Sequence, residues 1–359
     1  MRLRRLPLTI ALATGLLSLS AIGAGAGAGK TAFTQTNLVS NRTDQGASVI
    51  DPSLQNPWGI SASSTSPMWV SDNGAGVTTL YGGNGSKVPL TVVIPPGAGS
   101  SAGTLGTPTG TVFNGNSAEF RGDRFLFATE DGTLAGWQPA YGTVAHTEVD
   151  NSLPPPGAVY KGLAIGSTAA GDRLYAANFR GGAVDVFDTN FSPAGSFTDP
   201  KIPANYAPFN VQNLGGVLYV TFAMRDATGH DDIAGQGHGF VDAFDTNGNL
   251  LRRLVSHGRL DSPWGLAIAP ASFGDFAGDL LVGNFGDGRI NAYTVEKGNF
   301  RGVLTRTNGA PIAIDGLWAL RVGNGAPAPN GGDPNAVYFT AGINDEADGL
   351  FGKITNAQS

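Results

Sequence analysis

Cysteine is absent from the 359-residue chain, and charged residues make up only 14% of it. Without cysteine the protein has neither disulfides nor a cysteine nucleophile. Histidine is scarce too, with four residues, and no G-x-S-x-G string stands at a strand-to-helix turn, where the nucleophile elbow of serine hydrolases lies. The glycine-rich string at residues 82–85 does not sit at a strand-to-helix turn, so it does not predict a phosphate-binding loop. These absences argue against nucleophilic and nucleotide-dependent enzymes.

Only one long apolar run is found, from Leu6 to about Leu19, after the basic start Met1-Arg2-Leu3-Arg4-Arg5. Small residues follow it, which is the order of a secretory signal peptide, and the run is too short for a stable membrane span. We expect residues 1–29 to be this signal peptide. With no second such run and no lipobox cysteine, the sequence predicts an exported protein, periplasmic or extracellular, without a membrane span.

The formal net charge is -6, and it becomes -9 when the three arginines of the leader are removed. An acidic protein is a poor partner for nucleic acid or an anionic membrane. We therefore expect an acidic monomer that binds neither nucleic acid nor membrane. Glycine, with 54 residues, has about twice its usual share, which many tight hairpin turns explain.

A short segment recurs six times, at intervals of about 48 to 55 residues, a period typical of arrays of small sheets. Each copy ends in a small residue and an aliphatic one, or a close variant of that pair. The copies are Pro57-Trp58-Gly59-Ile60, Pro108-Thr109-Gly110-Thr111, Tyr160-Lys161-Gly162-Leu163, Pro208-Phe209-Asn210-Val211, Pro263-Trp264-Gly265-Leu266 and Leu317-Trp318-Ala319-Leu320. Every copy is followed by an apolar strand, a polar turn and another strand.

The repeat predicts an all-β fold, a six-bladed β-propeller, formed by residues 30–359 as a single domain. We expect its blades to start near residues 56, 107, 159, 207, 262 and 316. The last repeat is one strand short, while residues 32–39 read as an extra strand before the first repeat. An open ring would leave unpaired strand edges. The N-terminal strand is therefore predicted to close the last blade.

Polar residues at equivalent hairpins should open on one rim of such a ring. Oxygen-rich rings suit a divalent cation such as calcium. The metal ligands predicted in this way are Asp72, Glu130, Asn178, Asn284 and Asp345. The alternative is that each residue only shapes its own turn.

The fourth repeat carries a long insertion in place of a hairpin turn, from Ala223 to Gly239. Long loops on a rigid scaffold often carry binding residues. The predicted ligand-binding residues of this loop are Asp226, His230, Asp231, Asp232 and His238. Their imidazole and carboxylate groups could bind a metal ion or act as a general base. No established metal-binding motif is present, however, and the alternative is a solvated glycine-rich loop whose polar side chains bind only its own backbone.

Trp58, Trp264 and Trp318 occupy matching places in three repeats. One interpretation makes them a platform for stacking a sugar or aromatic ligand, and the other makes them packing between blades. We include them among the candidate ligand-binding residues.

Several strings resemble an uncharacterised family of exported bacterial proteins over nearly the whole mature chain. They are Asn56-Pro57-Trp58-Gly59-Ile60, Trp69-Val70-Ser71-Asp72-Asn73-Gly74, Ala207-Pro208-Phe209-Asn210-Val211-Gln212, Asn284-Phe285-Gly286-Asp287-Gly288-Arg289-Ile290 and Phe339-Thr340-Ala341-Gly342-Ile343-Asn344-Asp345-Glu346. The repeat starts also resemble NHL-repeat and gluconolactonase-like propellers. The latter resemblance implies a divalent cation in the central channel, held by carboxylates and amides.

Two functions follow from these patterns. The first is a binding or interaction module that uses one rim and the channel mouth to bind a small molecule, glycan or protein. The alternative is a divalent-metal-dependent hydrolase or lactonase of the gluconolactonase-like type. The fold by itself does not decide between them.

Overall fold

The computed structural model describes residues 31–358. The predicted signal peptide, residues 1–29, lies outside this part of the chain, so export stays a prediction. Within residues 31–358, none of the helices has the length and hydrophobicity that a membrane crossing requires.

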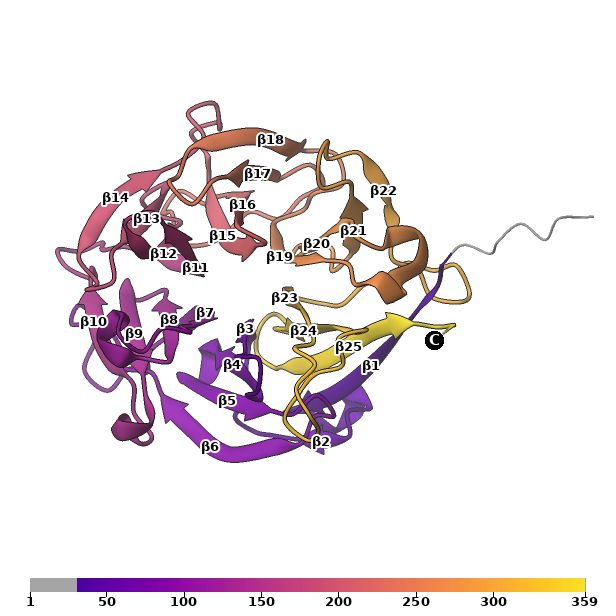
Figure 1. Cartoon of the computed structure of the whole chain (residues 1–359), viewed down its shortest axis with the longest axis horizontal. Coiled ribbons are helices and arrows are strands. Elements are labelled where there is room, and N and C mark those ends of the chain that lie inside the picture. The colour runs from indigo at the N-terminus through magenta and orange to yellow at the C-terminus, as the bar shows by residue number, and fades with distance from the viewer. Residues whose placement is uncertain (1–30, 359) are drawn as a thin grey trace, which may run out of the picture. The chain divides into compact units, whose positions relative to one another are not determined.

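The described residues form six sheets arranged around a central channel, so the predicted six-bladed propeller is confirmed (Figure 1). Blades 1 to 5 each contain four strands in sequence order, and blade 6 combines strands from both ends of the chain. The strands of blades 1 to 3 are β3 (Pro57–Ser61), β4 (Met68–Asp72), β5 (Val77–Tyr81), β6 (Lys87–Val93), β7 (Pro108–Phe113), β8 (Phe125–Thr129), β9 (Thr133–Trp137), β10 (His146–Asp150), β11 (Tyr160–Thr168), β12 (Gly171–Asn178), β13 (Ala183–Phe187) and β14 (Pro193–Phe197).

The remaining three blades follow the same plan. Their strands are β15 (Tyr206–Leu214), β16 (Val217–Met224), β17 (Phe240–Phe244), β18 (Leu250–Ser256), β19 (Pro263–Ile268), β20 (Leu280–Asn284), β21 (Ile290–Tyr293), β22 (Phe300–Val303), β23 (Leu317–Val322), β24 (Val337–Ala341) and β25 (Leu350–Asn356), with β1 (Phe33–Ser40) and β2 (Val49–Ile50) from the N-terminal end. Short 3-10 helices lie in the connections, at η1 (Thr43–Gln45), η2 (Asn73–Ala75), η3 (Phe120–Gly122), η4 (Pro139–Tyr141) and η5 (Ala271–Phe276).

The ring closes through β1, which pairs antiparallel with β25 and completes blade 6. Phe33 of β1 is 1% exposed and packs against Phe273, with 4.9 Å between the ring centroids. The prediction that the N-terminal strand closes the last blade is confirmed.

The glycine at the third position of four of the six repeats has a steric reason. The first strands of neighbouring blades approach so closely that a Cβ on Gly110 would lie 2.3 Å from the backbone nitrogen of Leu163. A Cβ on Gly59 would lie 2.6 Å from the carbonyl oxygen of Thr109. Glycine therefore allows the innermost strands to line a narrow channel.

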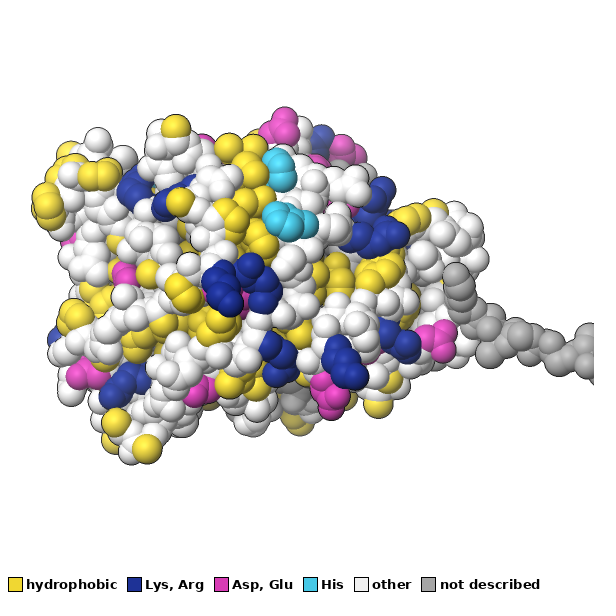
Figure 2. Space-filling model, turned by 90° about the horizontal axis from the view of Figure 1, so that it is seen from above, with side chains coloured by type: hydrophobic (Ala, Val, Ile, Leu, Met, Phe, Trp, Pro, Cys, Tyr) yellow, Lys and Arg dark blue, Asp and Glu magenta, His cyan; other side chains and the backbone are white. Residues whose placement is uncertain are grey.

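Large aromatic side chains fill the spaces between blades. Trp69 of β4 stacks on Phe125 of the next blade at 4.0 Å between ring centroids and also packs on Trp137. The outer wall, seen edge-on in Figure 2, carries basic, acidic and hydrophobic side chains in an interspersed pattern.

Candidate functional site

The first strand of every blade begins at the same end of the channel, which we call the mouth. The second strand is antiparallel to the first, so it ends at the mouth: Asp72 pairs with Pro57, and Thr129 pairs with Pro108. The hairpins that the sequence places on one rim do share this rim.

The second residue of each repeat points into the middle of the channel, and these six side chains are almost fully buried. They are Trp58, Thr109, Lys161, Phe209, Trp264 and Trp318, all with exposures of 0–3%. Five of the six are uncharged. Lys161 is the exception, and this makes blade 3 different from the other five.

The tryptophans form an aromatic plug across the channel. Trp58 and Trp318 stack with 3.5 Å between centroids, and Trp264 meets both edge-on. Phe285, from the turn after β20, stacks on the other face of this group, 4.0 Å from Trp318. The plug is part of the central core, and the rings of Trp58, Phe285 and Trp318 also line a pocket above it.

Lys161 extends from β11 toward the mouth with its side chain 3% exposed. Its Nζ donates a hydrogen bond of 2.6 Å to Oε1 of Glu130 and lies 5.1 Å from the Trp58 ring. A buried ammonium group is strongly destabilising unless it is paired. Glu130, which follows the end of β8, supplies the opposite charge.

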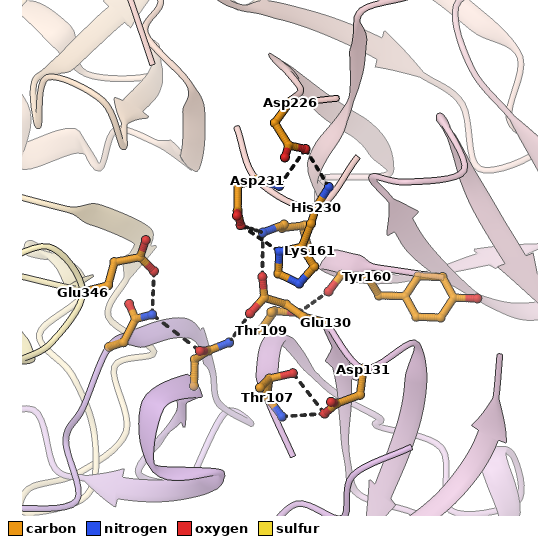
Figure 3. A network of polar contacts seen from close by, with 12 residues as sticks. Thr107, Thr109, Glu130, Asp131, Tyr160, Lys161, Asp226, His230, Asp231 and Glu346 are labelled. Atoms are coloured by element: carbon orange, nitrogen blue, oxygen red, sulfur yellow. Dashed lines mark hydrogen bonds and ion pairs between the residues drawn. The ribbon is translucent and has the colours of Figure 1, made fainter. Parts of the chain in front are cut away.

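A chain of polar contacts continues from Glu130 around the mouth (Figure 3). Asn73 donates to Oε2 of Glu130 at 2.8 Å, and Asn56 donates to Glu346 at 2.6 Å. The Asn56 and Asn73 amides lie 3.5 Å apart. Residues of blades 1, 2, 3 and 6 are thus linked in one network, which fixes their side chains.

The long loop of blade 4, between β16 and β17, covers the other side of Lys161. Oδ1 of Asp231 lies 3.8 Å from Nζ of Lys161 and 2.7 Å from Nδ1 of His230. Asp226 accepts hydrogen bonds from Thr228 and from the backbone N–H of His230, so it holds the loop in shape. The loop thus supplies the polar side chains of His230 and Asp231 to the mouth, and Asp226 fixes their position.

Together these groups enclose a mouth pocket of about 240 Å³. Its lining residues are Trp58, Glu130, Lys161, His230, Asp231, Asp232, Ala234, Phe285, Trp318 and Glu346. Four carboxyl groups face one ammonium group and three aromatic rings. With histidine neutral, the lining has an excess of negative charge.

The carboxyl groups differ in their pKa values. Burial by itself would raise the pKa of Glu130, but the charge and hydrogen bond of Lys161, with the hydrogen bond from Asn73, outweigh it and hold the pKa below its ordinary value. Burial raises the pKa of Asp232 and of Glu346. Oδ2 of Asp232 is buried without a hydrogen-bond partner among the described residues. These two carboxyl groups are the ones that a positive charge would stabilise most.

Glu346 sits on a strained turn. Three consecutive residues, Asn344, Asp345 and Glu346, have φ angles of 58°, 50° and 63°. Each such left-handed conformation of a non-glycine residue is uncommon, and its strain is of order 1 kcal/mol or more. The surrounding structure holds Glu346 in the pocket against this strain.

One group of side chains has the spacing of a metal site. Ligand atoms of Glu130, His230 and Asp231 all lie within 4.8 Å of one another. Imidazole and carboxylate donors suit zinc and similar divalent ions. However, the Lys161 ammonium already lies between Glu130 and Asp231, where it opposes a second positive charge.

The other predicted metal ligands do not reach the pocket. The carboxylate of Asp72 is fully buried and accepts from Thr79, and Asn284 donates to the carbonyl of Arg259. Asn178 donates to Asp185 and accepts from its own turn. Asp345 is exposed beside Glu346.

Strand alternation explains this difference. Asp72, Asn178 and Asn284 pair with the first residue of a strand and face away from the channel, whereas the next residue along faces inward. The inward positions include Asn73, Glu130, Phe179 and Phe285. His238, in the blade 4 loop, hydrogen-bonds through Nδ1 to the carbonyl of Ile233 and does not line the pocket.

The sequence prediction missed Lys161 and Phe285, and among its metal ligands it chose Asp72 and Asp345 instead of their neighbours Asn73 and Glu346. For Lys161 a signal was available: it stands at a repeat position that is otherwise aromatic or threonine. A charged residue at a position predicted to be buried indicates a partner and a special role. Glu346 is adjacent to the predicted Asp345, and only the turn geometry distinguishes them.

No protein-family model matches the chain. Two solved structures are similar at low sequence identity. A structural genomics protein of unknown function from Bacteroides thetaiotaomicron has a TM-score of 0.52 and 11% identity, and the match covers 90% of this chain and 76% of that one. A catalytically inactive virginiamycin B lyase from Staphylococcus aureus with quinupristin has a TM-score of 0.51 and 13% identity, and the match covers 91% of this chain and 99% of that one. At these identities the likeness shows the fold alone.

Two relatives from Acanthamoeba polyphaga mimivirus are much closer in sequence. Uncharacterized protein R648 is 35% identical over 336 residues, which cover 89% of this chain and 80% of the relative. Uncharacterized protein L690 is 33% identical over 342 residues, covering 89% and 85%. These relatives are viral, so the predicted link to exported bacterial proteins stays a prediction. The chain belongs to the family of these two mimivirus proteins, and its fold is a six-bladed β-propeller.

Proposed function

We propose that this protein is a binding module that takes a small organic cation, such as an amine, into the mouth pocket. The observation that carries the proposal is the composition of the pocket: four carboxyl groups around three aromatic rings, with Lys161 and His230 as the basic side chains. Carboxylates attract an ammonium group, and aromatic faces bind one through its positive charge.

The arrangement of the pocket supports an organic cation over a bare metal ion. Glu130 is already neutralised by Lys161, so the groups left for a ligand are Glu346, Asp231 and Asp232. Glu346 lies in the same lining as the Trp318 and Phe285 rings. A ligand with a positive end and an apolar body matches both kinds of surface.

Calorimetric titration with putrescine tests the proposal, with the neutral diol of the same length as the control ligand. We expect the diamine to bind and the diol not to bind. Glu346→Gln should weaken binding of the diamine about tenfold because it removes one charge-assisted contact. Asp345→Asn, next to it but exposed outside the pocket, should leave the affinity unchanged. Equal affinities for diamine and diol would overturn the proposal.

The affinity should also depend on pH in one direction. Burial raises the pKa of Glu346 and Asp232, so these groups take up protons above the ordinary pH range of carboxylic acids. Binding of a cation should therefore weaken as the pH falls through these raised values. An affinity for the diamine that does not change with pH would argue against these carboxyl groups as its partners.

A second candidate function is that of a divalent-metal-dependent hydrolase. The group Glu130, His230 and Asp231 favours it, and a metal held there would polarise a substrate oxygen or activate water. Elemental analysis of the purified protein, with melting curves in calcium and in zinc, separates this candidate from amine binding. Loss of bound metal in His230→Ala would support it, and the absence of any divalent ion and of any melting shift would remove it.

A further inference from the structure

The opposite end of the channel has a different character from the mouth. There the first strands of all six blades line a cavity of about 200 Å³, which we call the far cavity. A second cavity of about 360 Å³ adjoins it and shares Gln212, Asn213 and Arg321. Among the residues that line the two cavities, Arg321 of β23 is the one charged side chain.

The guanidinium of Arg321 has no acidic partner among residues 31–358. Its Nη2 donates to the carbonyl oxygen of Ala62 at 3.0 Å, and its Nε is buried without a hydrogen-bond partner among these residues. Burial lowers the pKa of Arg321, and no neighbouring carboxylate acts in the opposite direction. An arginine placed in this way is a ready donor to an anion, because its planar fork matches a carboxylate.

The walls of the far cavity indicate the kind of anion. Ile60, Val112, Phe113 and Leu320 supply apolar surface, and the amide of Gln212 supplies a polar group. An inorganic phosphate ion would be poorly matched, because it is strongly hydrated and the cavity offers one cation. An anion with an apolar body fits the mixture.

We propose that the far cavity binds small organic carboxylates through Arg321. The site lies at the other end of the channel from the mouth pocket, with the aromatic plug between them. It takes the opposite charge and does not depend on the proposed amine binding.

Calorimetric titration of the full chain with acetate, butyrate, benzoate and phenylacetate tests the proposal. Benzamide serves as the neutral control, and inorganic phosphate as the competing anion. We expect benzoate or phenylacetate to bind more tightly than acetate, and benzamide not to bind. The proposal would be overturned if none of the four carboxylates bound at concentrations up to about 10 mM. It would also be overturned if phosphate bound more tightly than they do.

Variants show whether Arg321 is the group responsible. Arg321→Met should weaken carboxylate binding about 10- to 100-fold, while Arg321→Lys keeps the charge without the fork and should lose less. Arg301→Met, on an outer strand with its side chain 48% exposed, is the matched control and should bind as the original protein does. Equal affinity of Arg321→Met and the original protein would refute the assignment.

Two further measurements separate ligand binding from folding. Because the Arg321 charge is uncompensated, Arg321→Met should melt no lower than the original protein in the absence of ligand. The carboxylates should raise the melting temperature of the original protein but not of this variant. Glu346→Gln should leave carboxylate binding unchanged, because Glu346 lies at the other end of the channel. The proposal of amine binding at the mouth and the proposal of carboxylate binding in the far cavity can therefore fail independently of each other.

Discussion

Replacing Lys161 by methionine tests the central claim about the mouth, that one buried ammonium group compensates Glu130. The two side chains are 3% and 11% exposed, and Nζ and Oε1 are 2.6 Å apart. Removing one partner of such a pair leaves the other charge buried and destabilises a protein by about 3–5 kcal/mol. With an unfolding entropy of about 0.7 kcal/mol/K for a domain of about 330 residues, the melting temperature should fall by about 4–7 °C.

The pH dependence of this effect has a defined sign. In the original protein the pKa of Glu130 is lowered, so its contribution to stability is present above the unfolded-state pKa and is lost as the pH falls. Without Lys161, burial dominates and the pKa of Glu130 should rise. The stability difference between Lys161→Met and the original protein should therefore shrink between about pH 7 and about pH 4.

Urea denaturation followed by circular dichroism measures the free energy of unfolding of each variant. Glu130→Gln combined with Lys161→Met should recover most of the loss, because neither charge is then left alone. Lys297→Met, at an exposed turn, is the control and should change stability by less than about 0.5 kcal/mol. A Lys161→Met protein as stable as the original at every pH would refute the reasoning.

Two further predictions concern stability away from the mouth. Phe33→Ala should lower the free energy of unfolding by about 3–5 kcal/mol, because the ring is buried where β1 closes the propeller. Thr34→Ala, at an exposed position on the same strand, is the control. Equal melting temperatures of the two variants would argue against the closure. Burial raises the pKa of Asp242 to about 8, so the folded state favours its neutral form and loses stability as the pH rises from the unfolded-state value through 8. Asp242→Asn should then be more stable than the original protein by at least about 1 kcal/mol near pH 8 and equal to it near pH 4. Denaturation curves of both proteins at the two pH values measure this difference. A variant that is less stable than the original protein at both pH values would contradict the raised pKa of Asp242.

The blades could be predicted from the sequence because each one repeats the same physical requirement. A small residue such as Gly110 is needed where inner strands nearly touch, and a bulky second residue such as Trp58 is needed to fill the channel. The closing strand was predictable for a similar reason, since the last repeat lacked a strand.

The site was harder to predict, because strand alternation turns neighbouring residues to opposite sides. Asp72 and Asn73 are adjacent in sequence, yet only Asn73 joins the network around Glu130. A register known to within one residue is not sufficient to choose between them. The long loop of blade 4 was predictable as a feature, but its contact with Lys161 of blade 3 depends on how the loop folds back over the channel.

The closure of the ring by β1 also has a consequence for the timing of folding. Ser40 of β1 donates a hydrogen bond to the carbonyl of Gly349, and the two residues are 309 positions apart in the chain. At a synthesis rate of about 5–20 residues per second, the first strand waits for its partner for about 15 to 60 s. During that interval a strand with free backbone donors and acceptors, and with the apolar side chains of Phe33, Leu38 and Val39 uncovered, is open to other chains. Blade 6 therefore cannot form before β25 has been made, and the N-terminal strand is open to wrong pairing until then.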